Sequence, residues 1–243
     1  MPAPPRALVY NGRASSALDS VNVLALDTSS ELCSVALWLA GEVRVRETLA
    51  GQRHTELVLP MTHELLTEAG IRLADLDGIA FGAGPGSFTG LRIACGLAQG
   101  LALGAGLPLM PVGTLEALAE GAGAERVLAC IDARLGEVYH GAYRREAGAW
   151  QSVSPPRLCL PADAPQVPGD GWVGCGSGFD AYGELLARRY DGRIAGVLTG
   201  RYPRAVDIAA LAAPRLAAGG GVDPAEAAPV YLRDKVALKE SER

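Results

Sequence analysis

Apolar residues along this chain alternate between short uninterrupted runs and longer stretches with helical spacing. Residues 21–27 form a continuous apolar run that ends in a carboxylate. Two segments of strand character follow, 33–39 and 42–49, and Gly41 supplies the turn between them. Residues 54–69 have the spacing of a helix, and the apolar positions that share one of its faces are Leu57, Met61, Leu65 and Ala69. The chain therefore starts as a strand-rich unit that passes into a helix.

The same order of elements occurs twice. A short strand, 78–81, leads into a glycine-rich turn and a second helix, 88–105, before a third helix at 114–120. Residues 127–132 are then again an apolar run ending in a carboxylate, and 137–143 are again a strand after a short turn. The remaining predicted elements are a proline-rich surface loop at 154–170, a strand at 172–175, and helices at 179–189 and 205–218.

This doubling predicts an α/β protein with two related lobes. Asp27 and Asp132 end the two equivalent runs, so we expect their turns to face a shared cleft. The alternative is a chance likeness between two ordinary hairpins. The predicted organisation has four parts: a flexible leader at 1–20, an N-terminal lobe at 21–108, a C-terminal lobe at 109–220 and a tail at 221–243. Packing of the tail against the N-terminal lobe is one of the arrangements that this organisation allows.

Composition narrows the functional classes. The chain is 49% hydrophobic and 20% charged, which is ordinary for a folded protein in water. Its formal charge is −5 and it has no cluster of lysines and arginines, so direct, strong binding of nucleic acid is disfavoured. The five cysteines include no C-x-x-C pair, which predicts buried free thiols in a reducing cytoplasm and no zinc site.

An uncharged stretch at 93–110 reaches the lower length limit of a membrane span. Gln99 and several glycines dilute its hydrophobicity, and Arg92 comes directly before it. We therefore predict a buried helix of an α/β core and no membrane association.

Two segments could accept an anion such as a nucleotide phosphate. The first segment is Asp27, Thr28 and Ser29 at a strand end. Its carboxylate can accept a hydrogen bond from a metal-bound water, and its hydroxyls can donate hydrogen bonds to a phosphate. The second segment runs from Gly82 to Gly90 into a helix, and its candidate contacts are Gly84, Gly86 and Ser87. Both segments are also compatible with tight turns that have no ligand, with Ser87 as the helix N-cap of the second, and for the Asp27 segment a turn cap is the favoured interpretation. A weaker candidate of the same kind spans 174–178.

Three glycines share one face of the second helix: Gly96, Gly100 and Gly104. Each glycine costs about 1 kcal/mol relative to alanine in a helix interior, so a compensating interaction is expected. Either a neighbouring element of the same chain packs closely on this bare face, or another protein does.

Signals for catalysis are weak. His54, His63 and His140 do not have the spacing of a metal site, and no serine lies in a G-x-S-x-G turn. Sequence spacing does not distinguish any of three glutamates as a catalytic acid: Glu31, Glu116 and Glu137. We therefore predict no catalytic and no metal-ligating residue.

Six segments together resemble the bacterial TsaB (YeaZ) family over residues 21–236: LALDTSSELCSVAL, HTELVLPM, AFGAGPGSFTGLRIACGLAQGLA, PVGTLEALA, IDARLGEVYHGAY and PVYLRDKVA. The resemblance implies an actin/Hsp70-like (ribonuclease-H-like) duplicated two-lobe fold. It also implies a cytoplasmic, non-catalytic subunit that activates TsaD, with the ATPase TsaE, in forming tRNA threonylcarbamoyladenosine. Such a subunit is a homodimer when alone, contacts tRNA only through the complex, and has no cofactor except ATP or ADP at the complex interface.

The catalytic paralogue TsaD is the main alternative within this resemblance. TsaD carries a His-x-x-x-His metal pair after the glycine helix, and Thr114 and Leu118 occupy those positions here. Neither side chain can supply an imidazole, so the departure favours the partner over the enzyme. A stand-alone ATPase or a glycoprotease-like metallopeptidase remains the alternative function.

The resemblance also implies an interface. In the family, the first two long helices pair with the equivalent helices of a partner. Carried over to this chain, the interface residues are Leu57, Met61, Leu65, Arg92, Gly96 and Gly100.

Overall fold

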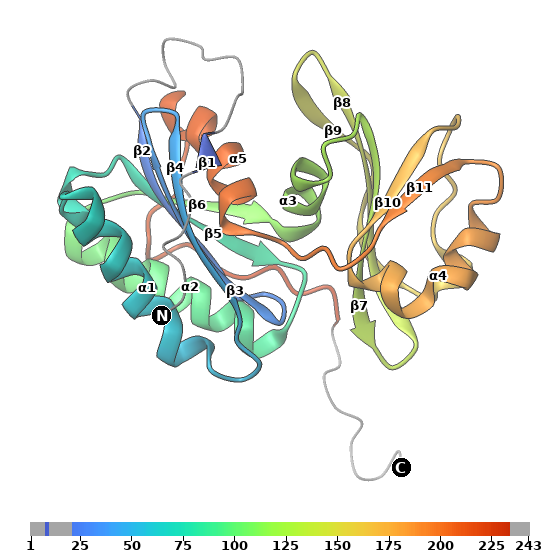
Figure 1. The fold of residues 1–243 in the computed structure, drawn as a ribbon, viewed down its shortest axis with the longest axis horizontal. Coiled ribbons are helices and arrows are strands. Elements are labelled where there is room, and N and C mark those ends of the chain that lie inside the picture. Colours follow the sequence, from blue (N-terminus) through green and yellow to red (C-terminus); the bar gives the residue numbers. More distant parts are fainter. Residues whose placement is uncertain (1–7, 10–20, 234–243) are drawn as a thin grey trace.

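The chain forms two α/β lobes that lie side by side, each built on its own sheet (Figure 1). The computed structural model describes residues 8–9 and 21–233. Of the expected leader, only strand β1 (Leu8–Val9) is therefore described, and it pairs with Val43 and Glu42 of β4. The flexibility expected for the other residues of 1–20 lies outside the described residues.

The first sheet has six strands in the order β1-β4-β3-β2-β5-β6. The central strand β2 (Asn22–Asp27) pairs antiparallel with β3 (Leu32–Leu39) and parallel with β5 (Gly78–Gly84). Its continuous apolar run is explained by burial on both faces, because helices cover the sheet on either side. The outer strands are β4 (Glu42–Leu49), which pairs with β3, and β6 (Leu109–Gly113), which pairs with β5.

The second sheet repeats this arrangement in the order β11-β10-β7-β8-β9. Strand β7 (Arg126–Arg134) pairs antiparallel with β8 (Glu137–Glu146) and parallel with β10 (Trp172–Cys175). The outer strands are β9 (Ala149–Cys159) and β11 (Ile194–Leu198). Each lobe thus has a central strand with a hairpin on one side and a parallel neighbour on the other, which confirms the doubled two-lobe prediction.

The helices cover the two sheets unequally. Helices α1 (His54–Ala69) and α2 (Phe88–Ala105) lie on the outer face of the first sheet, and α5 (Ala205–Ala217) covers its inner face. Helix α3 (Thr114–Gly121) lies between the lobes, and α4 (Ser177–Arg189) packs on the second sheet. The described part of the chain also contains short 3₁₀ turns at Leu73–Asp75 and Pro161–Asp163.

The expected lobe boundary at 108/109 does not coincide with the packing. Strand β6 follows residue 108 but hydrogen-bonds to β5 in the first sheet, because its apolar run completes that parallel sheet. Helix α5 was expected within 109–220, yet Ile208 and Ala209 belong to the core on the inner face of the first sheet. The tail, as far as residue 233, packs along α2 and then reaches the second lobe.

The proline-rich loop expected at 154–170 is partly strand. Pro155 and Pro156 lie in β9, an edge strand, where a missing backbone donor leaves no partner unsatisfied. Strand β11 was not predicted, because its five residues are mostly exposed at the opposite edge.

Four of the five cysteines are buried free thiols and Cys159 is half-buried. Helix α2 is long and apolar enough to cross a membrane by length and composition alone. In the structure, one face of this helix packs on the sheet through Ala94, Ala98 and Ala102.

Candidate functional site

A cleft of about 1040 Å³ lies between the two lobes. The first lobe contributes the turn after β2 and the glycine-rich turn before α2, and the second lobe contributes the turn between β7 and β8. Asp132 lines the cleft, as the doubling predicted, but Asp27 is fully buried behind its wall. The two aspartates of the repeated unit are therefore not equivalent in exposure.

Asp27 is held by its own turn. Its carboxylate accepts hydrogen bonds from the backbone N–H of Ser29 at 3.0 Å and from the Ser29 hydroxyl at 2.9 Å. Burial raises the pKa of Asp27 to about 7, although these hydrogen bonds oppose the shift. A Cβ on Gly82 would lie 1.9 Å from the Asp27 Oδ2, so this glycine leaves room for the carboxylate.

The glycine-rich turn packs directly on the turn after β2. The Thr28 hydroxyl donates to the carbonyl oxygen of Gly90 at 2.6 Å, and the Ser87 N–H donates to the carbonyl oxygen of Ser29 at 2.7 Å. A Cβ on Gly86 would lie 2.6 Å from that same Ser29 oxygen. Close contact between two backbone turns therefore explains these glycines.

The remaining residues of this turn have similar partners. A Cβ on Gly84 would lie 2.6 Å from the carbonyl oxygen of Val230, and the Ser87 hydroxyl caps α2 by accepting from the Gly90 N–H at 3.3 Å. Ser29, Gly86 and Ser87 also line the cleft, so a nucleotide phosphate at these turns stays a prediction. The six residues concerned serve chain packing and capping: Asp27, Thr28, Ser29, Gly84, Gly86 and Ser87.

The third glycine-rich segment, 174–178, is also explained by packing. A Cβ on Gly176 would lie 2.3 Å from the carbonyl oxygen of Cys130, and one on Gly174 would lie 2.6 Å from the Phe179 ring. The Ser177 hydroxyl accepts a hydrogen bond from the Asp132 N–H at 3.1 Å, which ties this turn to β7.

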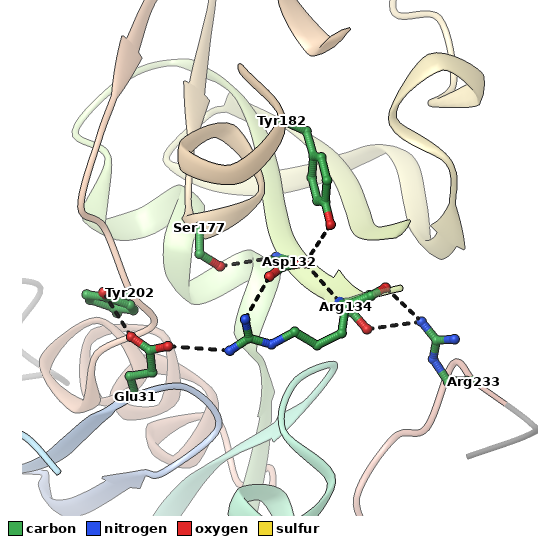
Figure 2. A network of polar contacts seen from close by, with 8 residues as sticks. Glu31, Asp132, Arg134, Ser177, Tyr182, Tyr202 and Arg233 are labelled. Carbon is green, nitrogen blue, oxygen red and sulfur yellow. Dashed lines mark hydrogen bonds and ion pairs between the residues drawn. The ribbon is translucent and has the colours of Figure 1, made fainter. Parts of the chain in front are cut away.

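A polar network crosses the cleft (Figure 2). Arg134 forms ion pairs with Asp132 of its own lobe at 3.2 Å and with Glu31 of the first lobe at 3.4 Å. Tyr202 donates to the other carboxylate oxygen of Glu31 at 3.5 Å, and Tyr182 donates to Asp132 at 3.2 Å. Sequence reasoning treated Glu31 as an ordinary solvated acid and missed Arg134 and Tyr202.

The positions aligned with the paralogue's metal pair are buried. The Thr114 hydroxyl donates to the carbonyl oxygen of Pro85, and Leu118 packs in the core of the second lobe. Among residues 8–9 and 21–233, no three His, Cys, Asp or Glu side chains gather as a metal ion would require. His140 is buried with its Nε2 at 2.7 Å from the Tyr190 hydroxyl, and burial lowers the pKa of this imidazole to about 4.

The glycine row of α2 faces outward. Among residues 8–9 and 21–233, nothing lies within 4 Å of a Cβ on any of the three glycines, so no described element of the chain packs closely on this face. Leu103 on the same helix is 61% exposed and Leu59 on the neighbouring α1 is 50% exposed. A bare, partly apolar surface therefore spans the outer sides of both helices. We call it the α1–α2 face and define it by Leu59, Gly96, Gly100, Leu103 and Gly104.

One of the interface residues inferred from the resemblance is misplaced. Leu65 is fully buried against the sheet, because the apolar stripe of α1 points into the core. Leu57 and Met61 belong to the same stripe and are half-buried. Arg92 is exposed beside the α1–α2 face, with its guanidinium 3.5 Å from the centre of the Phe88 ring.

The buried carboxyls predict a pH dependence of stability. The pKa of Asp27 rises from 3.8 to about 7 on folding, so the folded chain keeps a proton that the unfolded chain releases in that range. Burial raises the pKa of Asp207 to about 7 as well. The free energy of unfolding should therefore fall as the pH rises from about 4 to about 7 and level off above.

In Asp27→Asn, the fall in the free energy of unfolding between pH 5 and pH 8 should be smaller by on the order of 2 to 4 kcal/mol than in the unsubstituted chain. Urea unfolding at the two pH values measures this difference. An unchanged decline in the variant would show that Asp27 is ionised in the folded chain at both pH values.

Two sheets of matching topology, with a cleft between them, define a duplicated two-lobe protein of the actin-like class. A family model described as "TsaD: tRNA N6-adenosine threonylcarbamoyltransferase" matches residues 45–240. The chain is 43% identical over 234 residues to the tRNA threonylcarbamoyladenosine biosynthesis protein TsaB of Escherichia coli, covering 90% of this chain and 98% of the relative. The protein of the same name from Haemophilus influenzae is 37% identical, covering 92% and 98%.

A solved structure agrees with these sequence matches. YeaZ from Pseudomonas aeruginosa superposes with a TM-score of 0.81 at 41% identity, covering 87% of this chain and 100% of that one. The chain therefore belongs to the TsaB family, within the wider group that the TsaD model describes.

Proposed function

We propose that this chain is the non-catalytic subunit of a cytoplasmic complex that forms threonylcarbamoyladenosine on tRNA. Its relatives carry the name of that biosynthesis. In this proposal the chain binds and activates a TsaD-type catalytic subunit, a TsaE-type ATPase joins them, and tRNA is contacted through the complex. Without its partner, the chain pairs with a second copy through the same surface.

The observation that carries the proposal is the outward glycine row of α2. Three glycines along this helix cost up to about 3 kcal/mol relative to alanine, and no described residue lies within 4 Å of where their Cβ atoms would be. A helix from another protein can approach such a face closely and offset the cost through van der Waals contact. The exposed Leu59 and Leu103 would add apolar burial at the rim of the same surface.

The non-catalytic part of the proposal is supported by two substitutions. Thr114 and Leu118 occupy the positions of the paralogue's histidine pair, and both are buried with partners of their own. The proposal therefore assigns no catalytic residue to this chain.

The nucleotide part of the proposal concerns the assembled complex. The glycines of the turns that could cradle a phosphate are in close contact with Ser29, Thr28 and Val230 of this chain. We therefore assign ATP or ADP to the junction with the partner, and no cofactor to the isolated chain.

Reconstitution with purified proteins tests this function. We expect threonylcarbamoyladenosine to form on tRNA when this chain, a TsaD-type subunit, a TsaE-type ATPase and the substrates are mixed, and to be lost when this chain is omitted. Mass spectrometry of digested tRNA measures the product. Full modification without this chain would contradict the proposal.

The alternative of a stand-alone ATPase or metallopeptidase is examined on the isolated chain. We expect no turnover of ATP or of a peptide and no stoichiometric metal in elemental analysis. Robust turnover or one tightly bound metal ion per chain would support the alternative instead.

A further inference from the structure

The last described segment of the chain connects the α1–α2 face to the cleft. Residues 222–233 leave the end of α5, run along α2 and finish on the second lobe. We call this segment the C-terminal strap. It follows the flank of α2 next to the glycine row, and it has no regular secondary structure beyond one bridge between Val222 and Leu109.

The strap is fixed to the first lobe at several points. Backbone hydrogen bonds join Val222 and Leu109 in both directions, at 2.8 and 3.0 Å. The Gln99 amide, on α2, donates to the carbonyl oxygens of Pro224 at 2.9 Å and Ala227 at 3.1 Å. The Val230 N–H donates to the carbonyl oxygen of Ala83 on β5 at 2.7 Å. This part of the strap therefore moves with the first lobe.

The end of the strap is fixed to the second lobe. The Arg233 guanidinium donates to the carbonyl oxygens of Ala133 at 3.0 Å and Arg134 at 3.4 Å, at the end of β7 where the chain turns into β8 (Figure 2). It also forms an ion pair with Glu137 at 2.9 Å, and its side chain is only 18% exposed. Charge-assisted hydrogen bonds of this kind are stronger than neutral ones, so Arg233 is a latch between the lobes.

Tyr231 joins the latch to the start of α2. Its hydroxyl accepts a hydrogen bond from Arg92 Nε at 3.0 Å, and its ring lies 5.3 Å from that of Phe88. Arg92 lies on the outer surface of α2 beside the glycine row. Two residues of the strap, Tyr231 and Arg233, thus connect a docking surface with the turn that lines the cleft.

We infer that the C-terminal strap sets the opening of the cleft and couples it to occupancy of the α1–α2 face. The second half of this inference rests on the proposed function, because it needs a TsaD-type subunit on that face. A partner that engages Arg92 and Phe88 changes the packing of Tyr231, and the strap transmits the change to the β7–β8 turn through Arg233. By linkage, the lobe arrangement in turn alters the affinity for the partner.

The latch is tested on the isolated chain with Arg233→Ala. We expect the amides at 133–137 to exchange hydrogen about tenfold faster, because losing the guanidinium frees two carbonyls and Glu137. The matched control is Arg126→Ala, which removes an arginine that donates to the Asp170 carbonyl oxygen within the second lobe. Exchange at 133–137 should be unchanged in this control. Equal exchange in Arg233→Ala and the unsubstituted chain would overturn the latch.

The coupling is tested with Tyr231→Ala, which keeps Arg233 but removes the contact with Arg92. Binding of the TsaD-type subunit should alter exchange at 133–137 by at least threefold in the unsubstituted chain and should leave it unaltered in Tyr231→Ala. The same alteration in both chains, or none in either, would overturn the coupling. If the subunit does not bind at all, the proposed function fails, while the Arg233→Ala comparison still decides the latch.

Discussion

Replacing Gly90 with alanine is expected to lower the free energy of unfolding by about 3 to 5 kcal/mol. A Cβ at this position would lie 1.9 Å from the carbonyl oxygen of Thr28 and 2.9 Å from its carbonyl carbon. Both atoms are backbone, so relief requires that the turn after β2 and the first turn of α2 move apart. That movement would break the 2.6 Å hydrogen bond from the Thr28 hydroxyl to the Gly90 carbonyl oxygen.

Gly96→Ala in the same helix is the matched control. Its Cβ would meet no described residue within 4 Å, so alanine should raise the free energy of unfolding by about 0.5 to 1 kcal/mol through helix propensity alone. Urea unfolding followed by circular dichroism measures both variants. Equal effects of the two substitutions would contradict the assigned orientation of α2.

Replacing Gly100 with leucine is expected to weaken binding of a TsaD-type subunit by about 10- to 100-fold, which corresponds to about 1 to 3 kcal/mol of overpacking in the interface. Gly100 lies in the middle of the outward row, where the partner helix must approach most closely. Within one protomer the added side chain meets no described residue, so folding of the protomer should be unaffected or slightly strengthened, whereas the proposed pairing of two copies should weaken as well. Isothermal titration calorimetry measures the change in affinity.

Gly183→Leu provides the matched comparison for this prediction. Gly183 is also a helical glycine with open space around its Cβ, but it lies on α4 of the second lobe. Binding should be unchanged in this variant. If Gly100→Leu bound the partner as tightly as Gly183→Leu, the α1–α2 face would not be the docking surface.

Elements with strong local signals could be predicted from the sequence. Strand β2 and helix α2 were found within about a residue, because a continuous apolar run and a helical pattern ended by glycine depend on local sequence alone. Strand β6 was not predicted because it directly follows the apolar end of α2 in the sequence, and hydrophobic periodicity does not separate two adjoining apolar elements. Strand β9 was obscured by Pro155 and Pro156, which are tolerated only because the strand lies at an edge.

The candidate site was harder to predict, because its determinants are distant in sequence. The same glycines suit a phosphate-binding turn and a close contact between two turns, and only the folded chain shows that Thr28 and Ser29 lie against them. Arg134 and Tyr202 become informative only when folding brings Glu31 of the first lobe beside them. The periodicity of α1 correctly placed Leu65 and Met61 on one face, but it could not tell that this face is the buried one.

Hydrogen exchange on the unsubstituted chain, with and without a TsaD-type catalytic subunit, tests the docking surface most directly. We predict that, relative to the monomeric free chain, binding slows exchange in the outer turns of α1 and α2, at 55–61 and 92–104, and leaves α4 unchanged. A stable heterodimer whose protection lies on the second lobe, with α1 and α2 exchanging as in the free chain, would contradict this account.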